Sequence, residues 1–423
     1  MSFSKKLKAG ALQYVLAISV IIALVLFTFI SFVFLQQKLQ IKNSFYKESV
    51  LNVQYGFSLL TNLQLPYNTI KELQVSENKQ EKTIFFKRHW GIFDVVTIVS
   101  TVKKEHFVKM AILASNNKRD ALYLKDNNTP LVLAGNTKII GNLSLPKQGI
   151  KAGNIAGTSF NGNQLYYGIK KTSNKTLPII TNISYLNNLV HSRFITDEMT
   201  FFELSDGLKK QQSFTKPTHV YSSNGHLSLI NIELKGNIII HSNSKIIINA
   251  SANLEDIILI APEVEIKSNV KGNFQVFSSK SIKVDKNCKL SYPSALVLIN
   301  KKQIKNNSQK EQILIDIKEK STIKGIVLFK QKNKKNSMTF NPQIIISKGS
   351  SITGEVYCNQ NIELLGSVFG SIYTNNFITK QFGSVYVNHI FNGVINNSKL
   401  PKQYCGISFN NDKANLKVAK WVY

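Results

Sequence analysis

The sequence predicts a mainly β protein that is held in a membrane by one N-terminal helix and contains a parallel β-solenoid (β-helix). Three observations predict this fold class. No charged residue occurs between Ala9 and Gln37, short runs rich in Val, Ile, Thr and Phe follow from Thr83 onward, and these runs become rhythmic from about Tyr221. An antiparallel β-sandwich is the alternative, although sandwich strands are usually spaced more widely than these runs.

The first element is a transmembrane helix over residues 12–35, which read LQYVLAISVIIALVLFTFISFVFL. At ~1.5 Å per residue this run spans about 36 Å, enough to cross a hydrocarbon core of ~30 Å with some tilt. The run is longer than the apolar part of a cleaved secretory signal, and no small-x-small cleavage site follows it. We therefore expect residues 1–11 to form a cytoplasmic leader and the lipid bilayer to be the first partner.

The orientation of the span rests on the residues around it. Three lysines lie on each side of the span, so the charge balance alone does not set its direction. The short lead and the free amino group favour an N-terminus inside the cell. We then expect a single-pass protein of the inner (cytoplasmic) membrane of a bacterial cell envelope, with its C-terminal region outside the cytoplasm.

A helical stalk is expected next, over residues 36–65. Its apolar residues recur mostly at steps of three and four, which is typical of an amphipathic helix. They are Leu39, Phe45, Val50, Val53, Phe57 and Leu60. Pro66 ends the pattern, because proline cannot continue the hydrogen bonds of a helix.

The N-terminus combines a short basic leader with Lys5, Lys6 and Lys8, then Gly10, and an apolar helix that follows directly. With these features it resembles the N-termini of type IV pilins and type II secretion pseudopilins. The resemblance implies cleavage of the leader after Gly10 and assembly with other envelope or pilus-like subunits. One position departs from the family pattern, because Val15 stands where pilins usually carry Glu.

Short β-runs divide the middle of the chain into two regions. Residues 67–130 are expected to form a small β-rich domain, because their runs are rich in β-branched and aromatic residues and separated by Asn and Lys. Residues 131–220 are expected to form a Gly-rich β region, interrupted by a helix within 187–216. The glycines there suit turns, and none precedes the Lys-Ser/Thr pair of a phosphate-binding loop.

The β-solenoid is expected over residues 221–395, with a cap or tail over 396–423. Apolar positions alternate within its runs, as at Ile362, Leu364, Val368 and Ile372. A single coil cannot bury such residues, whereas a stack of coils gives a continuous core. The stretch ITGEVYCNQNIELLGSVFGSIYT, with Gly354, Gly366 and Gly370, resembles bactofilins and other polymer-forming β-helix proteins. This resemblance implies a β-helix that could self-associate.

No motif for catalysis, a cofactor or a metal occurs in the sequence. The three cysteines lie far apart, and the seven histidines lack HxH or HExxH spacing. The carboxylates of the solenoid form no Asp-Asp pair or DxD motif, and we expect them to be solvated charges on its outer face. They are Glu255, Asp256, Glu263, Glu265, Asp285, Glu311, Asp316, Glu319, Glu355 and Glu363. We therefore expect no enzyme; a β-helix carbohydrate-active enzyme is the second alternative.

The charge of the chain suggests a class of partner. Its 53 Lys and Arg outnumber its 24 Asp and Glu, which gives a net charge of +29. Such a charge attracts anionic polymers, so a module that binds DNA or a surface glycan is the first alternative to a structural or interaction protein. The candidate binding residues are Lys301, Lys302, Lys305, Lys330, Lys332, Lys334 and Lys335.

Overall fold

The structure is a computed structural model that describes residues 9–75, 81–191, 201–301, 313–331, 340–381 and 383–422. The chain forms two compact units. Unit 1 contains residues up to Ser58, Ile70–Phe85 and Ile98–Lys109, and unit 2 contains Leu59–Thr69, Phe86–Thr97 and Met110–Tyr423. We describe each unit by itself.

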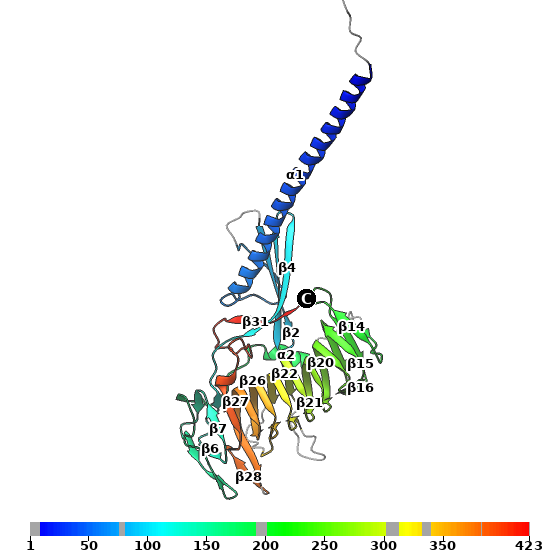
Figure 1. Ribbon diagram of the computed structural model, residues 1–423. Helices are drawn as coiled ribbons and strands as arrows, with labels where there is room; N and C mark the ends of the chain where they lie inside the picture. The colour runs from blue at the N-terminus through cyan, green and yellow to red at the C-terminus, as the bar shows by residue number, and fades with distance from the viewer. Residues whose placement is uncertain are drawn as a thin grey trace, which may run out of the picture. The chain divides into compact units, whose positions relative to one another are not determined.

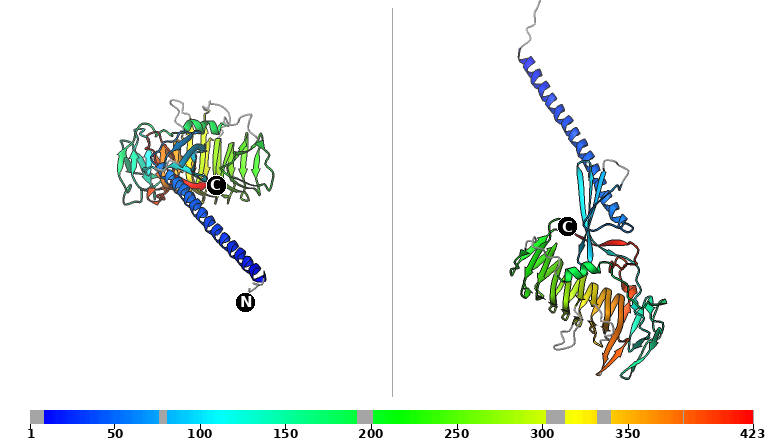
Figure 2. Two further views of the ribbon diagram at one scale, coloured as in Figure 1. Left: turned by 90° about the horizontal axis from the view of Figure 1, so that it is seen from above. Right: turned by 180° about the vertical axis from the view of Figure 1, so that it is seen from behind.

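The N-terminal helix α1 runs without a break from Ala9 to Leu59 (Figures 1 and 2). It is long and apolar enough to cross a membrane, which confirms the expected N-terminal apolar helix. The expected membrane span and stalk are therefore one helix, which ends shortly before Pro66. Leu39 was expected on the packed stripe of the stalk, but it is 56% exposed.

The second half of α1 packs within unit 1. Val53 and Phe57 are buried, and Gly56 lies between them in sequence on the same side of the helix. A Cβ atom at Gly56 would come within 3.1 Å of Phe85 and 3.2 Å of Ile98. Glycine therefore permits the close approach of the helix to these two strands, and this contact gives the stalk its packed face.

A five-stranded sheet has the order β1-β2-β3-β4-β31. Its strands are β1 (Ile70–Leu73), β2 (Glu81–Trp90), β3 (Phe93–Val102), β4 (Glu105–Ser115) and β31 (Leu416–Val422). In unit 2, β31 pairs antiparallel with β4, from Leu416 opposite Ser115 to Val422 opposite Met110. The expected C-terminal cap or tail thus supplies a strand to this sheet, after the short 3-10 helix η1 (Asn397–Lys399).

A closed and mainly parallel sheet forms most of unit 2. Its first strands are β5 (Leu122–Leu124), β7 (Lys138–Ile140), β8 (Leu143–Leu145), β12 (Lys170–Thr172), β13 (Phe201–Phe202), β14 (Lys209–Gln212), β15 (His219–Ser223), β16 (Leu227–Leu229), β17 (Glu233–Gly236), β18 (Ile238–Ser242) and β19 (Lys245–Ile248). The later strands are β20 (Asn253–Ile266), β21 (Lys271–Val284), β22 (Lys289–Asn300), β23 (Leu314–Ile317), β24 (Thr322–Gln331), β25 (Ile344–Ile346), β26 (Ser351–Leu364), β27 (Ser367–Gln381), β28 (Ser384–Val387) and β30 (Val394–Asn396).

Smaller elements of unit 2 accompany the closed sheet. A three-stranded sheet contains β29 (His389–Phe391), β6 (Leu131–Ala134) and β9 (Ile150–Ala152), and β10 (Asn154–Ile155) pairs with β11 (Thr158–Ser159). Helix α2 (Ile183–Val190) packs against β20, β21 and β22, and it is visible as the green helix across these strands in Figure 2. The helix expected within 187–216 therefore begins earlier than expected, and residues 192–200 lie outside the described part.

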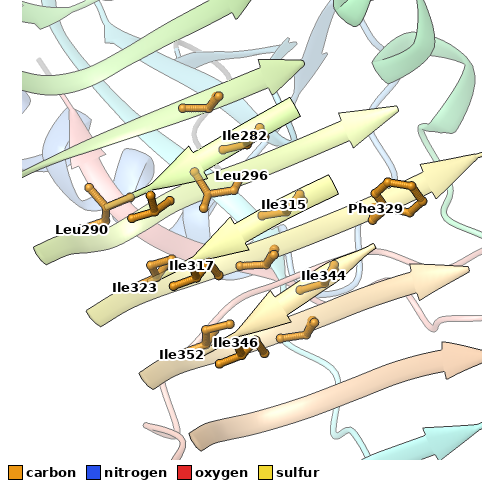
Figure 3. Close-up of a cluster of buried hydrophobic side chains, with 14 of the residues drawn as sticks. Ile282, Leu290, Leu296, Ile315, Ile317, Ile323, Phe329, Ile344, Ile346 and Ile352 are labelled. Atoms are coloured by element: carbon orange, nitrogen blue, oxygen red, sulfur yellow. The ribbon is translucent and has the colours of Figure 1, made fainter. Parts of the chain in front are cut away.

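The core of the closed sheet consists of apolar side chains that repeat in register from strand to strand. Figure 3 shows many of them on neighbouring strands. Three such rows are Leu290, Ile323, Ile352 and Val368; Leu296, Val327, Val356 and Ile372; and Ile282, Ile315, Ile344 and Ile362. All of these side chains are buried. The mainly β prediction is confirmed, and the parallel pairing argues against the antiparallel sandwich.

The closed sheet uses more of the chain than residues 221–395. Strand β5 pairs with β27, and β7 pairs with β30, so residues from the middle of the chain add to the last strands of the sheet. Strands β12 to β15 also belong to it. The middle region therefore does not fold apart from the repeat region, because its short strands complete the backbone hydrogen bonds at that end of the sheet.

Candidate membrane anchor and outer faces of the closed sheet

The first half of α1 is an apolar surface without protein cover. The apolar side chains from Leu12 to Leu35 are between 37% and 75% exposed. The most apolar window of the helix has a mean hydropathy of 2.9, and none of it is buried. Each Å² of such surface gains roughly 25 cal/mol when it leaves water, so this half of the helix is suited to lie in lipid. Gly10 lies in its first turn with nothing within 4 Å of its Cβ position.

Most of the lysines expected to bind an anionic polymer lie outside the described residues. This holds for Lys302, Lys305, Lys332, Lys334 and Lys335. The two described members differ: Lys301 is exposed just after β22, whereas Lys330 is half-buried near the end of β24, and burial lowers its pKa.

One outer face of the closed sheet alternates lysines with carboxylates, and we call it the paired face. Its in-register outward residues are Ile247, Glu265, Lys283, Asp316, Ile345 and Glu363, flanked by Lys245, Lys267 and Lys318. Lys245 Nζ lies 2.6 Å from Glu265 Oε2, and Lys318 Nζ lies 2.8 Å from Asp316 Oδ2. The hydrogen bonds from Lys245 and Lys267 lower the pKa of Glu265 to about 2. Lys245, Lys267 and Lys318 are thus paired with carboxylates, and Lys283 stands in register between Glu265 and Asp316.

A second outer face presents lysines and hydroxyl groups, and we call it the lysine face. Its outward residues are Lys271, Lys289, Thr322, Lys324, Ser351, Thr353, Ser367 and Phe369. Lys271 and Lys289 stand directly opposite each other on β21 and β22, and both are exposed. Among the described residues, no carboxylate forms an ion pair with Lys271, Lys289 or Lys324. This face could not be predicted from the sequence, because its lysines are brought together only by the register of the strands.

The third outer face is apolar and covered, and it holds a buried charge cluster; we call it the covered face. Its side chains include Ile258, Phe277, Val297, Leu328 and Tyr373, which belong to one buried cluster with residues of α2 and the C-terminal segment. Cover of this kind explains why apolar side chains point outward from the sheet here.

The charge cluster of the covered face joins Arg119, Glu355 and Asp412. The Arg119 guanidinium donates to both carboxylate oxygens of Asp412 at 2.6 Å, and its Nε lies 3.6 Å from Glu355 Oε1. The backbone N–H of Ile407 donates to Glu355 Oε2 at 2.6 Å. Burial raises the pKa of Glu355 to about 7, although Arg119 opposes this shift. The cluster fastens the C-terminal segment to the sheet.

Three carboxylates depart from the expected solvated outer face. Glu355 is 2% exposed, Asp256 is 7% exposed, and Glu363 is 8% exposed. Asp256 accepts a hydrogen bond from Lys420 Nζ at 2.7 Å, and Glu363 accepts one from the backbone N–H of Lys380 at 3.2 Å. The expectation was wrong for these residues. Segments distant in sequence cover Asp256 and Glu355, whereas the partner of Glu363 lies on the neighbouring strand β27. Glu311 lies outside the described part.

A polar cluster in unit 2 has the residue types of an acid–base site. His89 is stacked between Tyr67 and Tyr185 at ring-centroid distances of 3.7 and 4.0 Å, and its Nδ1 lies 3.0 Å from Asp94 Oδ1. Tyr67 Oη donates to Asp94 Oδ2 at 3.0 Å, and Lys87 Nζ lies 3.2 Å from the same oxygen. Burial raises the pKa of Tyr67, and that of Tyr185 to about 12.

The cavity beside this cluster limits what it can bind. It is lined by Asp94, Asn182 and Ile407, among others, and has a volume of about 20 Å³. A water molecule needs roughly 10–15 Å³ on this measure, so the cavity accommodates water and not a substrate. In the part of the chain that the structure describes, no group of three or more His, Cys, Asp or Glu side chains is arranged to hold a metal ion. The hydrogen bonds and ring stacking hold Tyr67, His89, Asp94 and Tyr185 against one another.

No protein-family model and no curated protein sequence matches the chain, so the resemblance to bactofilins finds no support there. Among solved structures, the competence-associated pilin ComZ from Thermus thermophilus matches with 8% identity and a TM-score of 0.22. The match covers 89% of this chain and 96% of that chain. A TM-score of 0.22 is too low to establish a shared fold, so the function of this chain has to be inferred from its own geometry.

Proposed function

We propose that this chain is a membrane-anchored, pilin-like structural or interaction protein of a bacterial envelope or secretion system. It is held in the inner membrane by α1, with the region after the span outside the cytoplasm. The observation that carries this proposal is the division of α1 into two halves. The first half exposes only uncharged, mostly apolar side chains, as lipid requires, and the second half packs its Gly56 side against two strands.

The closed sheet suits a scaffold, and we interpret it as a parallel β-solenoid. Strands β22, β24, β26 and β27 pair with one another in this order, in parallel and in register, and each adds one buried side chain to an existing row. Each coil then buries its apolar residues only against its neighbours, so stability accumulates along the stack. Such a stack displays long outer faces, which suits contacts with other subunits or with polymers.

The function proposed here includes no catalysis. Glu265, Asp316 and Glu355 are engaged in ion pairs, and the cavity beside Asp94 is the size of a water molecule. A glycosidase needs two carboxyl groups facing each other across a substrate-sized space at roughly 5–10 Å. The proposed carbohydrate-active enzyme therefore has less support than a structural role.

Membrane extraction of the full chain tests the anchor. We expect the wild-type chain to stay in the membrane pellet after an alkaline carbonate wash and to be released only by detergent. Replacing Leu24 and Val25 with Arg should release it, because each Arg at the centre of a span costs roughly 2.5–3.5 kcal/mol. Replacing Leu39 and Leu51 with Arg is the matched control, since both are exposed on the same helix beyond the span. A soluble wild-type chain, or equal release of both variants, would contradict the proposal.

Processing of the leader tests the pilin-like part of the proposal separately. Co-expression with a prepilin peptidase should shorten the chain by the residues up to Gly10, as measured by intact mass. The Gly10→Val variant should keep its leader, because a β-branched side chain blocks the position before the cut. If the mass does not change, the chain is an anchored protein without pilin-type processing.

A further inference from the structure

The lysine face keeps like charges close together without neutralising them. Lys271 lies opposite Lys289, and Lys289 lies opposite Thr322, whose strand carries Lys324 two residues later on the same side. Like charges directly opposite on neighbouring strands destabilise a sheet. On the paired face, by contrast, strand β21 carries Lys283 between two carboxylates, Glu265 and Asp316. Because its lysines remain close together, the lysine face has a positive electrostatic potential that can attract an anionic ligand.

Hydroxyl groups continue the two rows in which these lysines stand. The first row runs from Lys289 through Thr322 to Ser351 and Ser367, and the second runs from Lys324 through Thr353 to Phe369. Each hydroxyl can donate one hydrogen bond and accept two. Neighbouring strands are ~4.8 Å apart, so the first row offers a polar group at each step of that length, and the second row offers two before Phe369. One pyranose unit of an extended glycan is about as long as this step.

We propose that the lysine face binds a linear acidic polysaccharide that runs across the strands. The carboxylates of its sugars would meet Lys271, Lys289 and Lys324, and its hydroxyls would meet the Ser and Thr rows. At the end of the second row, the ammonium group of Lys399 lies over the ring of Phe369, 5.0 Å from its centroid, and adds a further positive charge beside the hydroxyl groups. This proposal adds a class of ligand to the proposed function. Binding of the polysaccharide can be measured on the purified protein, so the result does not depend on where the chain is located in the cell.

The geometry favours an acidic glycan over duplex DNA. DNA-binding surfaces usually contact phosphates with both Arg and Lys and reach base edges in a groove. The outward residues of the lysine face include no Arg, and they stand in rows along paired strands rather than on a helix that could enter a groove. DNA is therefore the competing outcome of the test.

The test is binding of the full chain, purified in detergent micelles, to polygalacturonate, a linear uronate polymer. Dextran serves as the neutral polymer, and a DNA duplex of matched charge is the competitor. We expect polygalacturonate to bind, with an affinity that falls as salt screens the charges, and dextran not to bind. Replacing Lys271, Lys289 and Lys324 together with Gln should weaken binding by about tenfold or more, whereas replacing all three with Arg should retain it.

The matched control replaces Lys245, Lys267 and Lys318 on the paired face with Gln, which removes the same charge from the same sheet. This control should weaken binding by less than about threefold, because those lysines are already engaged by carboxylates. Equal weakening by both sets, no binding of polygalacturonate at low salt, or tighter binding of DNA would each overturn the proposal. Thermal melting of each variant establishes that it is folded, and the single Lys271→Gln and Lys324→Gln variants serve if the triple variant is not.

Discussion

The lysine face and the paired face lie on the same closed sheet but differ in the partners of their lysines. Lysines of the paired face form ion pairs with carboxylates, whereas those of the lysine face stand beside one another and beside hydroxyl groups. Strand β21 contributes to both: Lys271 on the lysine face stands opposite Lys289, whereas Lys283 on the paired face stands between Glu265 and Asp316. The inward residues beneath the two faces are alike, since Val368 and Ile362 are both fully buried. The difference between the faces therefore lies only in the outward side chains.

This difference shows that the excess of lysines is not spread evenly over the sheet. A uniform excess of Lys would leave unpaired lysines on every face, but the paired face holds Lys245 and Lys318 in ion pairs. The lysine face is a local departure from this pairing, and substitutions on each face can test whether the contrast holds.

Charges placed beneath either face should be equally damaging. We expect Val368→Asp and Ile362→Asp each to lower the free energy of unfolding by at least about 3 kcal/mol, because an unpaired carboxylate would enter a packed interior. Denaturant unfolding of the full chain in detergent measures this. If either substitution cost less than about 1 kcal/mol, the two faces would not share one core.

Glu355, on the covered face, should make stability fall as the pH rises. Its pKa is raised from 4.5 to about 7, so between these values the folded state keeps a proton that the unfolded state has lost. The contribution is therefore present at low pH and disappears as the pH rises through about 7; it is of order 3 kcal/mol. Unfolding at a series of pH values should show this decline in the wild type and its loss in Glu355→Gln. An unchanged pH profile in the variant would mean that Glu355 does not hold this proton.

Glu265, on the paired face, should have the opposite pH dependence. Its pKa is lowered from 4.5 to about 2, so its contribution is present above about pH 4.5 and is lost as the pH falls through about 2. Because its lysine partners are partly in solvent, we expect this contribution to be at most about 1 kcal/mol. Glu265→Gln should remove it, as measured by acid unfolding. A variant that unfolds with acid just as the wild type does would show that the pairs on this face add nothing.

The smallest effects should come from exchanging single charges between the faces. Lys289→Glu should stabilise the chain by about 0.5 kcal/mol, because it places a carboxylate opposite Lys271. Lys283→Glu on the paired face should destabilise it by a similar amount, because Glu265 and Asp316 stand on both sides. Melting temperatures at low salt compare the two. If both substitutions changed the melting temperature in the same direction, the two faces would not differ in how their charges are paired.

The features that could be predicted from the sequence depend on the pattern of apolar and polar residues within one short segment. The apolar run from Leu12 to Leu35 needs no partner to be recognised, and alternating residues such as Ile362 and Leu364 indicate strands by themselves. The residues that were missed depend on contacts between distant segments. Arg119 and Asp412 are 293 residues apart, so the burial of Glu355 beside them could not be foreseen. Likewise, Lys271 and Lys289 lie in different runs, and only the strand register brings them together.

Protease accessibility is the decisive test of the anchored topology. A protease added to intact spheroplasts that express the full chain should digest everything beyond about residue 40 and leave a small membrane-embedded fragment. That fragment should carry the apolar run of α1, as identified by mass spectrometry. Digestion of the region after the span only once the membrane has been lysed would place that region in the cytoplasm. This result would contradict an anchored protein that presents its closed sheet outside the cell membrane.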